Sequence, residues 1–326
     1  MKQPRTILLT GAAGFIGHKT AQILLRDGYR VIGIDNMNDY YDVRLKEYRL
    51  GLLAVNDRFV FHEIDIEDKA KLKALFESNS IYAILNLAAR AGVGYSLENP
   101  SVYVSTNLQG SLNLLELAKD YIIEKFVLAS TSSIYAGEEV PFSEDRAVNS
   151  PISPYAASKK GAELMAYTYH YIYGIDVTVF RYFTVFGPAG RPDMSIFRFI
   201  KWIDEGSPLK LYGDGSQSRD FTYVDDIAEG TVKGLKKVGY EVINLGGGRN
   251  PLSLKTVIEF IENKLGKKAV IDHKAFQETD MKETRADISK AKLLLDWIPK
   301  VGFEEGLDRT VSWYKENKSW LQEISV

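Results

Sequence analysis

The first half of the chain alternates between short apolar runs and longer segments in which apolar residues recur every three or four positions. Runs of the first kind predict strands, and segments of the second kind predict helices. The predicted strands cover residues 7–10, 30–35, 59–63, 83–87 and 125–130, and helices are predicted after residue 17 and near residues 69–78 and 102–118. This alternation predicts an α/β fold built on a doubly wound parallel Rossmann sheet.

The second half of the chain has a less regular pattern. It predicts an apolar strand at residues 241–244, a glycine loop at residues 246–248, and helices near residues 254–265, 288–295 and 303–314. Neither a repeat nor a low-complexity linker interrupts it. These elements are therefore expected to pack against the first half of the chain.

The composition indicates a globular protein and limits its partners. The 326 residues are 45% hydrophobic and 26% charged, and the net charge of −2 gives no general attraction for nucleic acid or an acidic membrane. Without cysteine the chain has no disulfide or thiol nucleophile, and its four histidines lack metal-ligand spacing. We expect a small-molecule partner and no metal. Since the chain leads directly into a strand, we also expect a cytoplasmic protein.

Three glycines, Gly11, Gly14 and Gly17, join the first predicted strand to the first predicted helix. Such a turn lets backbone N–H groups approach a pyrophosphate at a helix N-terminus. The spacing departs from Gly-x-Gly-x-x-Gly and, taken alone, also fits an ordinary tight turn. The second strand, however, ends in Asp35, where a carboxylate binds the ribose of NAD and repels the 2′-phosphate of NADP. The two features together predict an NAD site.

Two further strand ends carry weaker signals for the same ligand. Asp65 and Ile66 follow the third strand and are placed to hold the adenine. Leu87, Ala88 and Ala89 follow the fourth strand and are small enough for a close approach of backbone to cofactor. An ordinary loop aspartate and a packed alanine pair are the alternative interpretations.

A Tyr-x-x-x-Lys pattern occurs three times, beginning at Tyr121, Tyr155 and Tyr314. On a helix the two side chains share a face, and a nearby ammonium favours the phenolate, so a group with a pKa of ~10 can act as a base near neutrality. Tyr121 precedes a strand, and Tyr314 lies in a terminal helix beside tryptophans. Tyr155 with Lys159 is therefore the preferred pair and predicts a general base for an alcohol.

Hydroxyl groups support this choice. Thr131, Ser132 and Ser133 end the fifth predicted strand, and the helix of Tyr155 begins about 20 residues later. Side chains at the carboxyl end of a central strand face the ligand crevice of such a sheet.

Together, the glycine turn, the Ser-Thr-Ser-Ser strand end and the Tyr155 helix resemble the extended short-chain dehydrogenase/reductase family over nearly the whole chain. The resemblance implies a tightly bound NAD⁺, a tyrosine base, a lysine that holds the nicotinamide ribose and lowers the tyrosine pKa, and a hydroxyl that aids proton transfer. These catalytic roles fall to Tyr155, Lys159 and Thr131. Further cofactor contacts are implied for Phe15, Ile16, Asn36 and Asn107.

Residues 181–194 resemble the substrate loop of nucleotide-sugar enzymes and, with residues 38–42 and 213–226, are most similar to UDP-glucuronate 4-epimerases. The resemblance implies that Arg191 and Thr184 lie near the C6 carboxylate, and that Arg219 and Arg285 clamp the diphosphate. Arg191 has an alternative role in tying down its loop, and Arg285 one as a surface charge. The full set of implied substrate contacts is Thr131, Ser132, Ser133, Tyr155, Thr184, Gly187, Pro188, Arg191, Tyr212, Gln217, Arg219 and Arg285.

Two positions depart from the pattern of that group. Gly94 stands where an arginine is common, and Asn86 stands where a histidine is common. The first departure removes a contact to carboxylate or phosphate that the group would lead us to expect.

The resemblance also implies an NAD-binding domain at residues 1–181 and 223–246, a smaller, discontinuous α/β substrate lobe at residues 182–222 and 247–326, and a homodimer. The implied reaction is 4-epimerization of UDP-glucuronate to UDP-galacturonate. Hydride leaves C4 for NAD⁺, the 4-keto sugar rotates, and hydride returns to the other face.

Three alternatives remain. One is a UDP-glucose 4-epimerase. A second is a UDP-glucuronate decarboxylase or a dehydratase, which is disfavoured because Ser132 and Ser133 stand where such relatives carry acids. The third is a dinucleotide-binding regulator without turnover, which would need neither Tyr155 nor Lys159.

Overall fold

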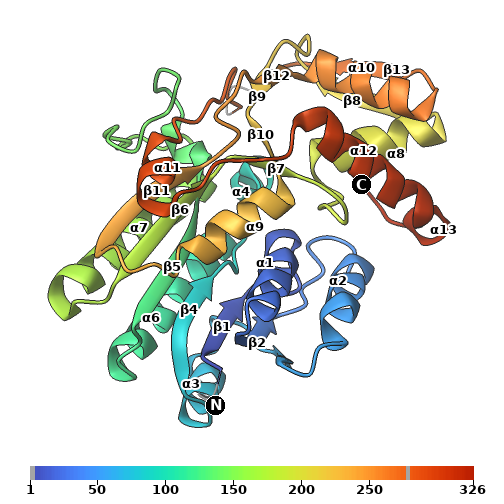
Figure 1. Cartoon of the computed structure of the whole chain (residues 1–326). Coiled ribbons are helices and arrows are strands. Elements are labelled where there is room, and N and C mark those ends of the chain that lie inside the picture. The colour runs from blue at the N-terminus through green and yellow to red at the C-terminus, as the bar shows by residue number, and fades with distance from the viewer. Residues whose placement is uncertain (1–3, 277–279) are drawn as a thin grey trace.

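A seven-stranded parallel sheet forms the centre of the protein (Figure 1). The computed structural model describes residues 4–276 and 280–326. The strand order is β11-β6-β5-β4-β1-β2-β3, and each neighbouring pair is parallel. Because the order reverses between β1 and β4, a crevice opens there at the carboxyl ends of the strands. The strands are β1 (Thr6–Thr10), β2 (Arg30–Asp35), β3 (Phe59–Glu63), β4 (Ile81–Asn86), β5 (Lys125–Thr131), β6 (Val177–Tyr182) and β11 (Tyr240–Leu245).

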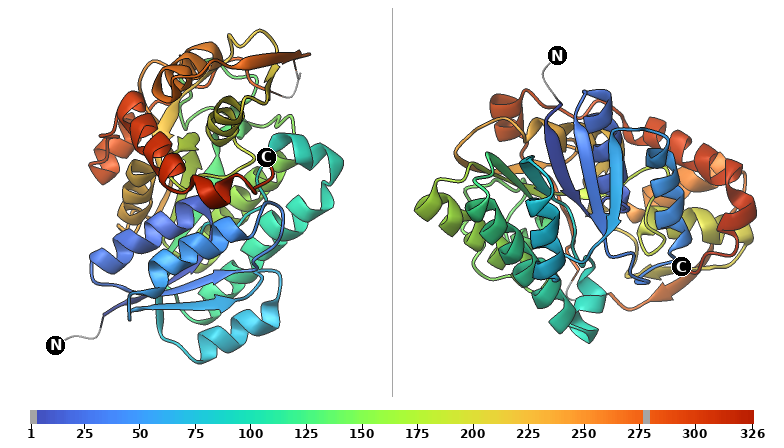
Figure 2. Two further views of the ribbon diagram at one scale, coloured as in Figure 1. Left: turned by 90° about the vertical axis from the view of Figure 1, so that its right-hand side faces the viewer. Right: turned by 90° about the horizontal axis from the view of Figure 1, so that it is seen from below.

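Helices cover both faces of this sheet (Figure 2). Successive residues of β1 point to opposite faces, so Leu8 joins the core beneath one layer of helices while Ile7 and Leu9 join the core beneath the other. The first layer contains α3 (Lys69–Glu77), α6 (Ser111–Asp120) and α7 (Pro154–Tyr173), and the second contains α1 (Phe15–Arg26), α9 (Val224–Lys233) and α11 (Ser289–Leu295). The predicted doubly wound sheet is confirmed.

Local signals define the ends of α7. The Ser153 hydroxyl accepts a hydrogen bond from the N–H of Ala156, Pro154 fills the first turn, and Gly174 ends the helix with a φ of 70°. This start fixes Tyr155 in the first turn of α7.

A smaller lobe lies beyond the carboxyl ends of the strands and has its own apolar core (Figure 1). Its strands pair in twos, and β8 is parallel to β13. The lobe contains β7 (Thr184–Phe186), α8 (Ser195–Glu205), β8 (Pro208–Tyr212), β9 (Ser218–Arg219), β10 (Phe221–Tyr223), β12 (Leu252–Ser253), α10 (Leu254–Leu265), β13 (Val270–Lys274), α12 (Phe303–Glu316) and α13 (Lys318–Leu321). From the later part of the chain, Leu295 and Trp297 pack into the core of the central sheet instead. The residue boundaries of the two domains stay a prediction.

The structure also adds elements that the apolar pattern did not predict. These include α2 (Arg44–Ala54), β6, α8 and β8. The helix predicted near residues 102–118 consists of a short helix α5 (Ser101–Tyr103), a π-helical segment (Val104–Gly110) and α6. A short helix α4 (Val93–Glu98) precedes them, and a 3₁₀ turn (Ser132–Tyr135) follows β5.

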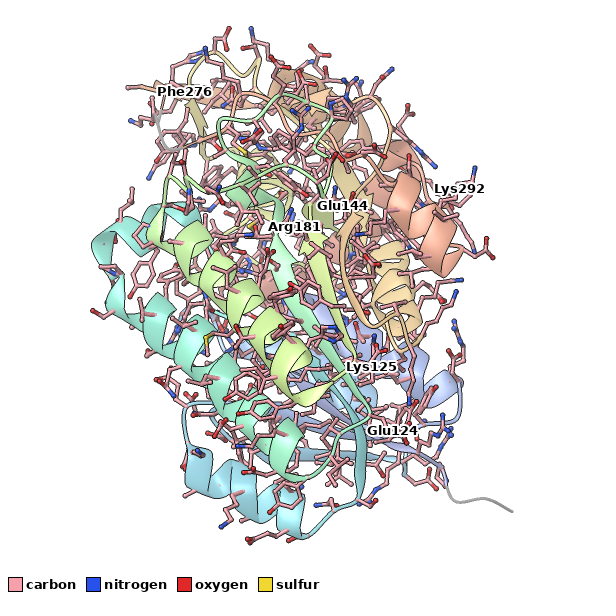
Figure 3. All side chains as sticks on the ribbon, turned by 90° about the vertical axis from the view of Figure 1, so that its left-hand side faces the viewer. Glu124, Lys125, Glu144, Arg181, Phe276 and Lys292 are labelled. Carbon is pink, nitrogen blue, oxygen red and sulfur yellow. The ribbon has the colours of Figure 1, made fainter. Side chains whose placement is uncertain are left out.

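The amino end of β5 is closed by a buried ion pair. Lys125 contacts the carboxylate of Asp176 and donates to the Thr178 hydroxyl at 2.8 Å. In Figure 3, Lys125 lies at the opposite end of the sheet from Arg181 and Glu144. Among residues 4–276 and 280–326, no helix is both long enough and apolar enough to cross a membrane.

Candidate active site

A cavity of about 410 Å³ opens at the carboxyl ends of β1, β2, β4, β5 and β6. Most of the residues that the sequence predicted for cofactor, catalysis and substrate line it, and they come from eight separate segments of the chain. From the predicted set, the lining includes Gly11, Gly14, Phe15, Ile16, Gly17, Asp35, Asn36, Asp65, Ile66, Leu87, Ala88, Ala89, Thr131, Ser132, Ser133, Tyr155, Lys159, Thr184 and Arg191.

The glycine turn at the floor of this cavity tolerates no side chain. A Cβ on Gly17 would lie 2.0 Å from the carbonyl oxygen of Gly11, and one on Gly11 would lie 2.8 Å from the backbone nitrogen of Ala88. Gly11 also has a φ of 68°, which favours glycine. Because α1 begins at Phe15, its free N–H groups and the positive end of its dipole face the cavity. This arrangement fits the pyrophosphate of a dinucleotide.

Asp35 lies at the end of β2 beside a lysine that sequence reasoning missed. Its carboxylate accepts the N–H of Met37 at 3.0 Å, and the ammonium of Lys46 lies 3.4 Å away. Lys46 also donates to the backbone oxygen of Asn38 at 2.9 Å. The residue after Asp35, Asn36, donates at 2.6 Å to the carboxylate of Asp65, which follows the neighbouring strand β3. These contacts fix two carboxylates at the wall where a ribose and an adenine would lie.

Tyr155 and Lys159 approach the cavity from α7. Lys159 is 4% exposed and donates to the carbonyl oxygen of Ala129 at 2.9 Å. Burial lowers its pKa to about 8, which the nearby Glu163 carboxylate opposes. Burial raises the pKa of Tyr155, while the Thr131 hydroxyl and the Arg191 charge act in the opposite direction. Burial is the largest of these effects, so the net shift of the Tyr155 pKa is upward, opposite to the lowering that the resemblance implied.

Hydroxyls at the end of β5 form a short chain beside this pair. Thr131 donates to the Ser133 hydroxyl at 3.1 Å and accepts the N–H of Ser133 at 3.1 Å. The ring of Tyr103 packs edge-on against Tyr155, with centroids 6.0 Å apart. Tyr103 donates to the carbonyl of Gly92 at 2.9 Å, so it holds the Tyr155 ring from behind.

A buried ion pair supports the end of β5. Arg181 donates to both oxygens of Glu163, at 3.0 and 2.8 Å, and Glu163 accepts the Ser130 hydroxyl at 2.6 Å. Both charged side chains are almost fully buried. Bidentate geometry of this kind fixes the strand relative to α7.

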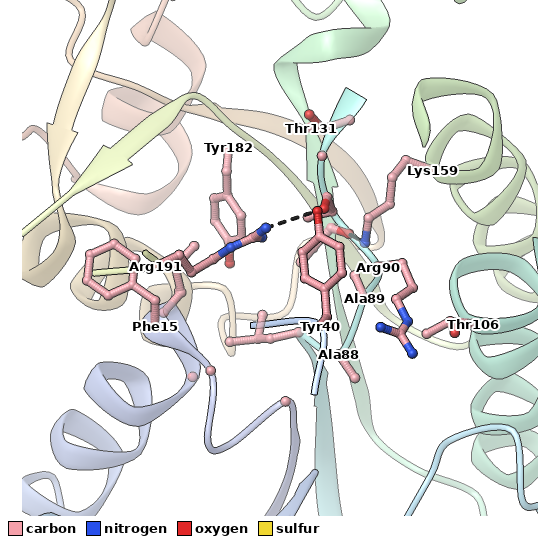
Figure 4. Close-up of a pocket in the computed structure, with 18 of the residues that line it drawn as sticks. Phe15, Tyr40, Ala88, Ala89, Arg90, Thr106, Thr131, Lys159, Tyr182 and Arg191 are labelled. Carbon is pink, nitrogen blue, oxygen red and sulfur yellow. Dashed lines mark hydrogen bonds between the residues drawn. The ribbon is translucent and has the colours of Figure 1, made fainter. Parts of the chain in front are cut away.

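Arg191 points into the cavity from the side opposite Lys159 (Figure 4). Its Nε donates to the carboxylate of Asp193 at 3.0 Å. Its Nη2 donates to the other oxygen of the same carboxylate and to the carbonyl of Ala91 at 3.3 Å. Its guanidinium carbon lies 5.6 Å from the Tyr40 ring centroid. Arg191 is therefore a cation in the cavity that already has a carboxylate partner within its own loop.

The remaining predicted substrate residues lie outside the main cavity. Gly187 lines a small adjoining hollow together with Thr184 and Arg191. Arg219 lines a second hollow that also contains Ser132, Ser133 and Thr184, and it pairs with Asp280 at 2.6 Å. Neither hollow nor the main cavity is lined by Pro188, Tyr212, Gln217 or Arg285.

Among the predicted cofactor residues, Asn107 lies behind the wall of the cavity. Its amide accepts the N–H of Arg90 at 2.9 Å and donates to the carbonyl of the same residue and to the Ser158 hydroxyl. It thereby holds the backbone of Arg90, a cavity-lining residue that sequence reasoning also missed. Arg90 donates to Asn38 at 3.1 Å, and Tyr40 lies beneath it.

The two departures from the expected pattern have separate outcomes. Asn86 is buried, accepts the Thr10 hydroxyl at 2.7 Å and donates to Ser111 at 3.0 Å, so it serves a polar network inside the sheet. A Cβ on Gly94 would meet nothing within 4 Å, which leaves open space at that point of α4.

Known proteins resemble this chain over almost its full length. A family model described as GDP-mannose 4,6 dehydratase matches residues 8–310. A UDP-glucuronate 4-epimerase of Thermodesulfobacterium geofontis is 59% identical over 98% of this chain and 99% of its own length. The UDP-glucuronic acid 4-epimerase of Bacillus cereus, solved with UDP-glucuronic acid and NAD, has a TM-score of 0.90 at 38% identity and covers 96% of this chain and 99% of its own. A UDP-glucose 4-epimerase of Thermotoga maritima with UDP-glucose has a TM-score of 0.86 at 31% identity, covering 96% and 99%.

Proposed function

This chain belongs to the GDP-mannose 4,6 dehydratase family of extended short-chain dehydrogenases/reductases, and we propose that it is an NAD-dependent UDP-glucuronate 4-epimerase. The observation that carries the substrate assignment is the meeting of Tyr155 and Lys159 with Arg191 in one cavity. A phenol and an ammonium suit oxidation of an alcohol, and a guanidinium opposite them suits a carboxylate on the same sugar.

The cofactor is NAD, as the relatives with the same fold indicate. We propose that the glycine turn binds its pyrophosphate, that Asp35 binds the adenine ribose, and that Lys159 binds the nicotinamide ribose. When bound, NAD⁺ supplies the oxidant that takes hydride from C4 and returns it to the other face of the 4-keto sugar. A closed cycle of this kind needs no cofactor exchange, so protein purified without added cofactor should release NAD on denaturation.

Proton transfer falls to Tyr155 and Thr131. Because burial raises the pKa of Tyr155, the phenol is protonated at neutral pH in the free protein. It can accept a proton from the sugar O4 only where positive charge stabilises the phenolate. Lys159, largely charged below its pKa of about 8, and Arg191 are cations placed to do so. The Thr131 hydroxyl, bonded to Ser133, can pass the proton between the sugar and the phenol.

The preference for UDP-glucuronate over UDP-glucose is proposed to come from Arg191 and Thr184. Both line the cavity, and a charge-assisted hydrogen bond to a carboxylate is stronger than one to a hydroxyl. The test is to incubate the purified protein with each sugar separately and to separate the products by chromatography. UDP-galacturonate as the main product supports the assignment. Faster formation of UDP-galactose makes the protein a UDP-glucose 4-epimerase instead.

Decarboxylation is the competing outcome, because the oxidised sugar is a β-keto acid. Loss of carbon dioxide requires the C5–C6 bond to lie roughly perpendicular to the ketone plane. We propose that Ser132, Ser133 and Thr184, which line the cavity, hold the carboxylate away from this alignment. Serine hydroxyls with an ordinary pKa are also poor acids for protonating C5.

A homodimer and a cytoplasmic location are further proposals. The outer face of α7 exposes Leu164, Tyr167 and Tyr171, which recur at helical spacing and form an apolar stripe. A second copy of the chain would cover this stripe, and light scattering would give twice the chain mass. The cysteine-free sequence needs no oxidising compartment, and cell fractionation tests the location.

A further inference from the structure

Arg49, in the middle of α2, is a fully buried arginine with no solvent-accessible surface. Its guanidinium has five N–H donors, and each has an acceptor. Nε and one terminal nitrogen donate to the carbonyl of Ala189 at 3.0 and 2.8 Å. The terminal nitrogens also reach the carbonyl of Gly190 at 3.2 Å, the carbonyl of Ala13 at 3.1 Å and the Tyr41 hydroxyl at 2.7 Å.

All of these acceptors are uncharged, so Arg49 is not the partner of a carboxylate in the way that most buried charges are. Burying a cation is unfavourable unless the surrounding groups satisfy it completely. Complete satisfaction here requires three segments to hold their relative positions. They are the glycine turn at Ala13, residues 36–43 at Tyr41, and the loop at Ala189 and Gly190.

The third of these segments leads directly into Arg191, the cation that faces the cavity. Ala189 has a φ of 55°, a left-handed conformation that a residue with a Cβ adopts only when its surroundings require it. Two of the five Arg49 donors hold the carbonyl oxygen of this residue. The strained turn, and with it the direction of the Arg191 side chain, thus depends on a residue 140 positions earlier in the chain.

We propose that Arg49 is a positioning residue. It holds the loop of Arg191 against the glycine turn, so that the sugar carboxylate is bound at a fixed position relative to the cofactor. The inference rests on the proposed function, since it assigns to Arg49 an effect on the carboxylate contact. It makes Arg49 act on the sugar through Arg191, without touching the substrate itself.

The test compares Arg49→Lys with wild type and with a control, Arg26→Met, whose side chain is exposed and pairs with surface carboxylates. A lysine keeps the charge but cannot reach all of the acceptors. We expect the KM for UDP-glucuronate to rise about tenfold, while the inhibition constant of UDP, which lacks the sugar carboxylate, changes less than twofold. Arg26→Met should leave both constants unchanged.

A double-mutant cycle separates positioning from a general loss of structure. In an Arg191→Ala background, Arg49→Lys should change the KM less than twofold, because the contact through which it acts is already gone. An unchanged KM in the single variant overturns the inference, as does an equal rise in both backgrounds or a parallel rise in the inhibition constant of UDP.

Should Arg49→Lys fail to fold, Tyr41→Phe takes its place, because it removes the hydroxyl that accepts from Arg49 at 2.7 Å and keeps the ring of this cavity-lining residue. Its expected KM increase is about threefold, again confined to the background that contains Arg191, and an unchanged KM overturns the inference. The wild-type assay separates the two hypotheses. If wild type makes no UDP-galacturonate, the proposed function fails, whereas a normal wild type with insensitive variants rejects only the role of Arg49.

Discussion

The two ends of strand β5 each bury a lysine, and the two lysines have different partners. At the amino end, Lys125 pairs with Asp176, and that carboxylate also accepts the N–H groups of Val238 and Gly239. At the carboxyl end, Lys159 donates to the backbone carbonyl of Ala129. Among the residues that the structure describes, no carboxylate forms an ion pair with it.

The difference separates charge that stabilises the fold from charge that is kept for a ligand. Burial lowers the pKa of both lysines, but Lys125 has the carboxylate of Asp176 as a partner, whereas Lys159 has only a backbone carbonyl and its pKa falls to about 8. A group with a perturbed pKa is a candidate for function when it also lies in a cavity, and Lys159, unlike Lys125, lines the cavity. Substitutions at the two ends of β5 should therefore have opposite consequences.

The largest expected effect is at the carboxyl end. Tyr155→Phe removes the oxygen that transfers the proton and little volume, so turnover should fall ~10² to 10⁴-fold while bound NAD is kept. Initial rates with UDP-glucuronate and NAD content after denaturation measure both quantities. Tyr173→Phe, at the exposed end of the same helix, is the control. Near wild-type rates in Tyr155→Phe would end the proposed mechanism.

At the amino end, Asp176→Ala should act on stability and not on chemistry. It leaves Lys125 buried without a partner, which typically costs about 3 to 5 kcal/mol of unfolding free energy. Denaturant titration measures the loss, with Asp272→Ala, from an exposed ion pair, as the control that should cost under about 1 kcal/mol. The folded variant should keep the wild-type kcat. A large fall in kcat at wild-type stability would contradict the comparison.

Lys159→Met should have the opposite effect on stability from Asp176→Ala. It should stabilise the protein after NAD has been removed. The folded pKa of Lys159 is about 8, below its usual 10.5, so the unfolded chain binds more protons between these values. The cost of burial is fully present below about pH 8 and fades as the pH rises toward 10.5. The variant should gain up to about 3 kcal/mol at pH 7 and almost nothing above pH 10. A variant that is less stable at pH 7 would show that the charge is compensated within the chain.

Arg191 fits neither side of this comparison. It lines the cavity, as Lys159 does, but it pairs with the carboxylate of Asp193, as Lys125 pairs with Asp176. If it binds the sugar carboxylate, Arg191→Ala should lower the preference for UDP-glucuronate over UDP-glucose about tenfold or more, as loss of a charge-assisted hydrogen bond of about 1.5 to 3 kcal/mol requires. The ratio of kcat/KM values measures it. An unchanged ratio would mean that Arg191 only stabilises its own loop, as Lys125 only stabilises the sheet.

The sequence predicted those parts of the site whose signals are local. Gly11, Gly14 and Gly17 exclude side chains from one turn, and Tyr155 with Lys159 follows a helix start marked by Ser153-Pro154. Each of these patterns is complete within a few residues, so it can be interpreted without knowing what packs against it. The strands β2 and β3 were predicted for the same reason, because each contains a short apolar run.

The sequence did not predict residues whose role depends on partners that are distant in the chain. The buried side of α2 includes Lys46 and Arg49, so the helix has no clean apolar stripe, and its charges are explained only by Asp35, Ala13 and Ala189. In β6, Arg181 interrupts the apolar pattern and is buried because Glu163 pairs with it. The pKa of Tyr155 was also misjudged, since burial is a property of the folded site.

The most direct test follows a deuterium label at C4 of UDP-glucuronate through the reaction of the unaltered protein in ordinary water, with the products identified by NMR. The proposed epimerization predicts UDP-galacturonate that keeps the deuterium at C4, because the hydride leaves and returns without exchange. It also predicts little carbon dioxide during a long incubation. Loss of the label from C4 would contradict hydride return, and a UDP-pentose or UDP-4-keto-pentose that rivals the C4 epimer would replace the epimerase with a decarboxylase.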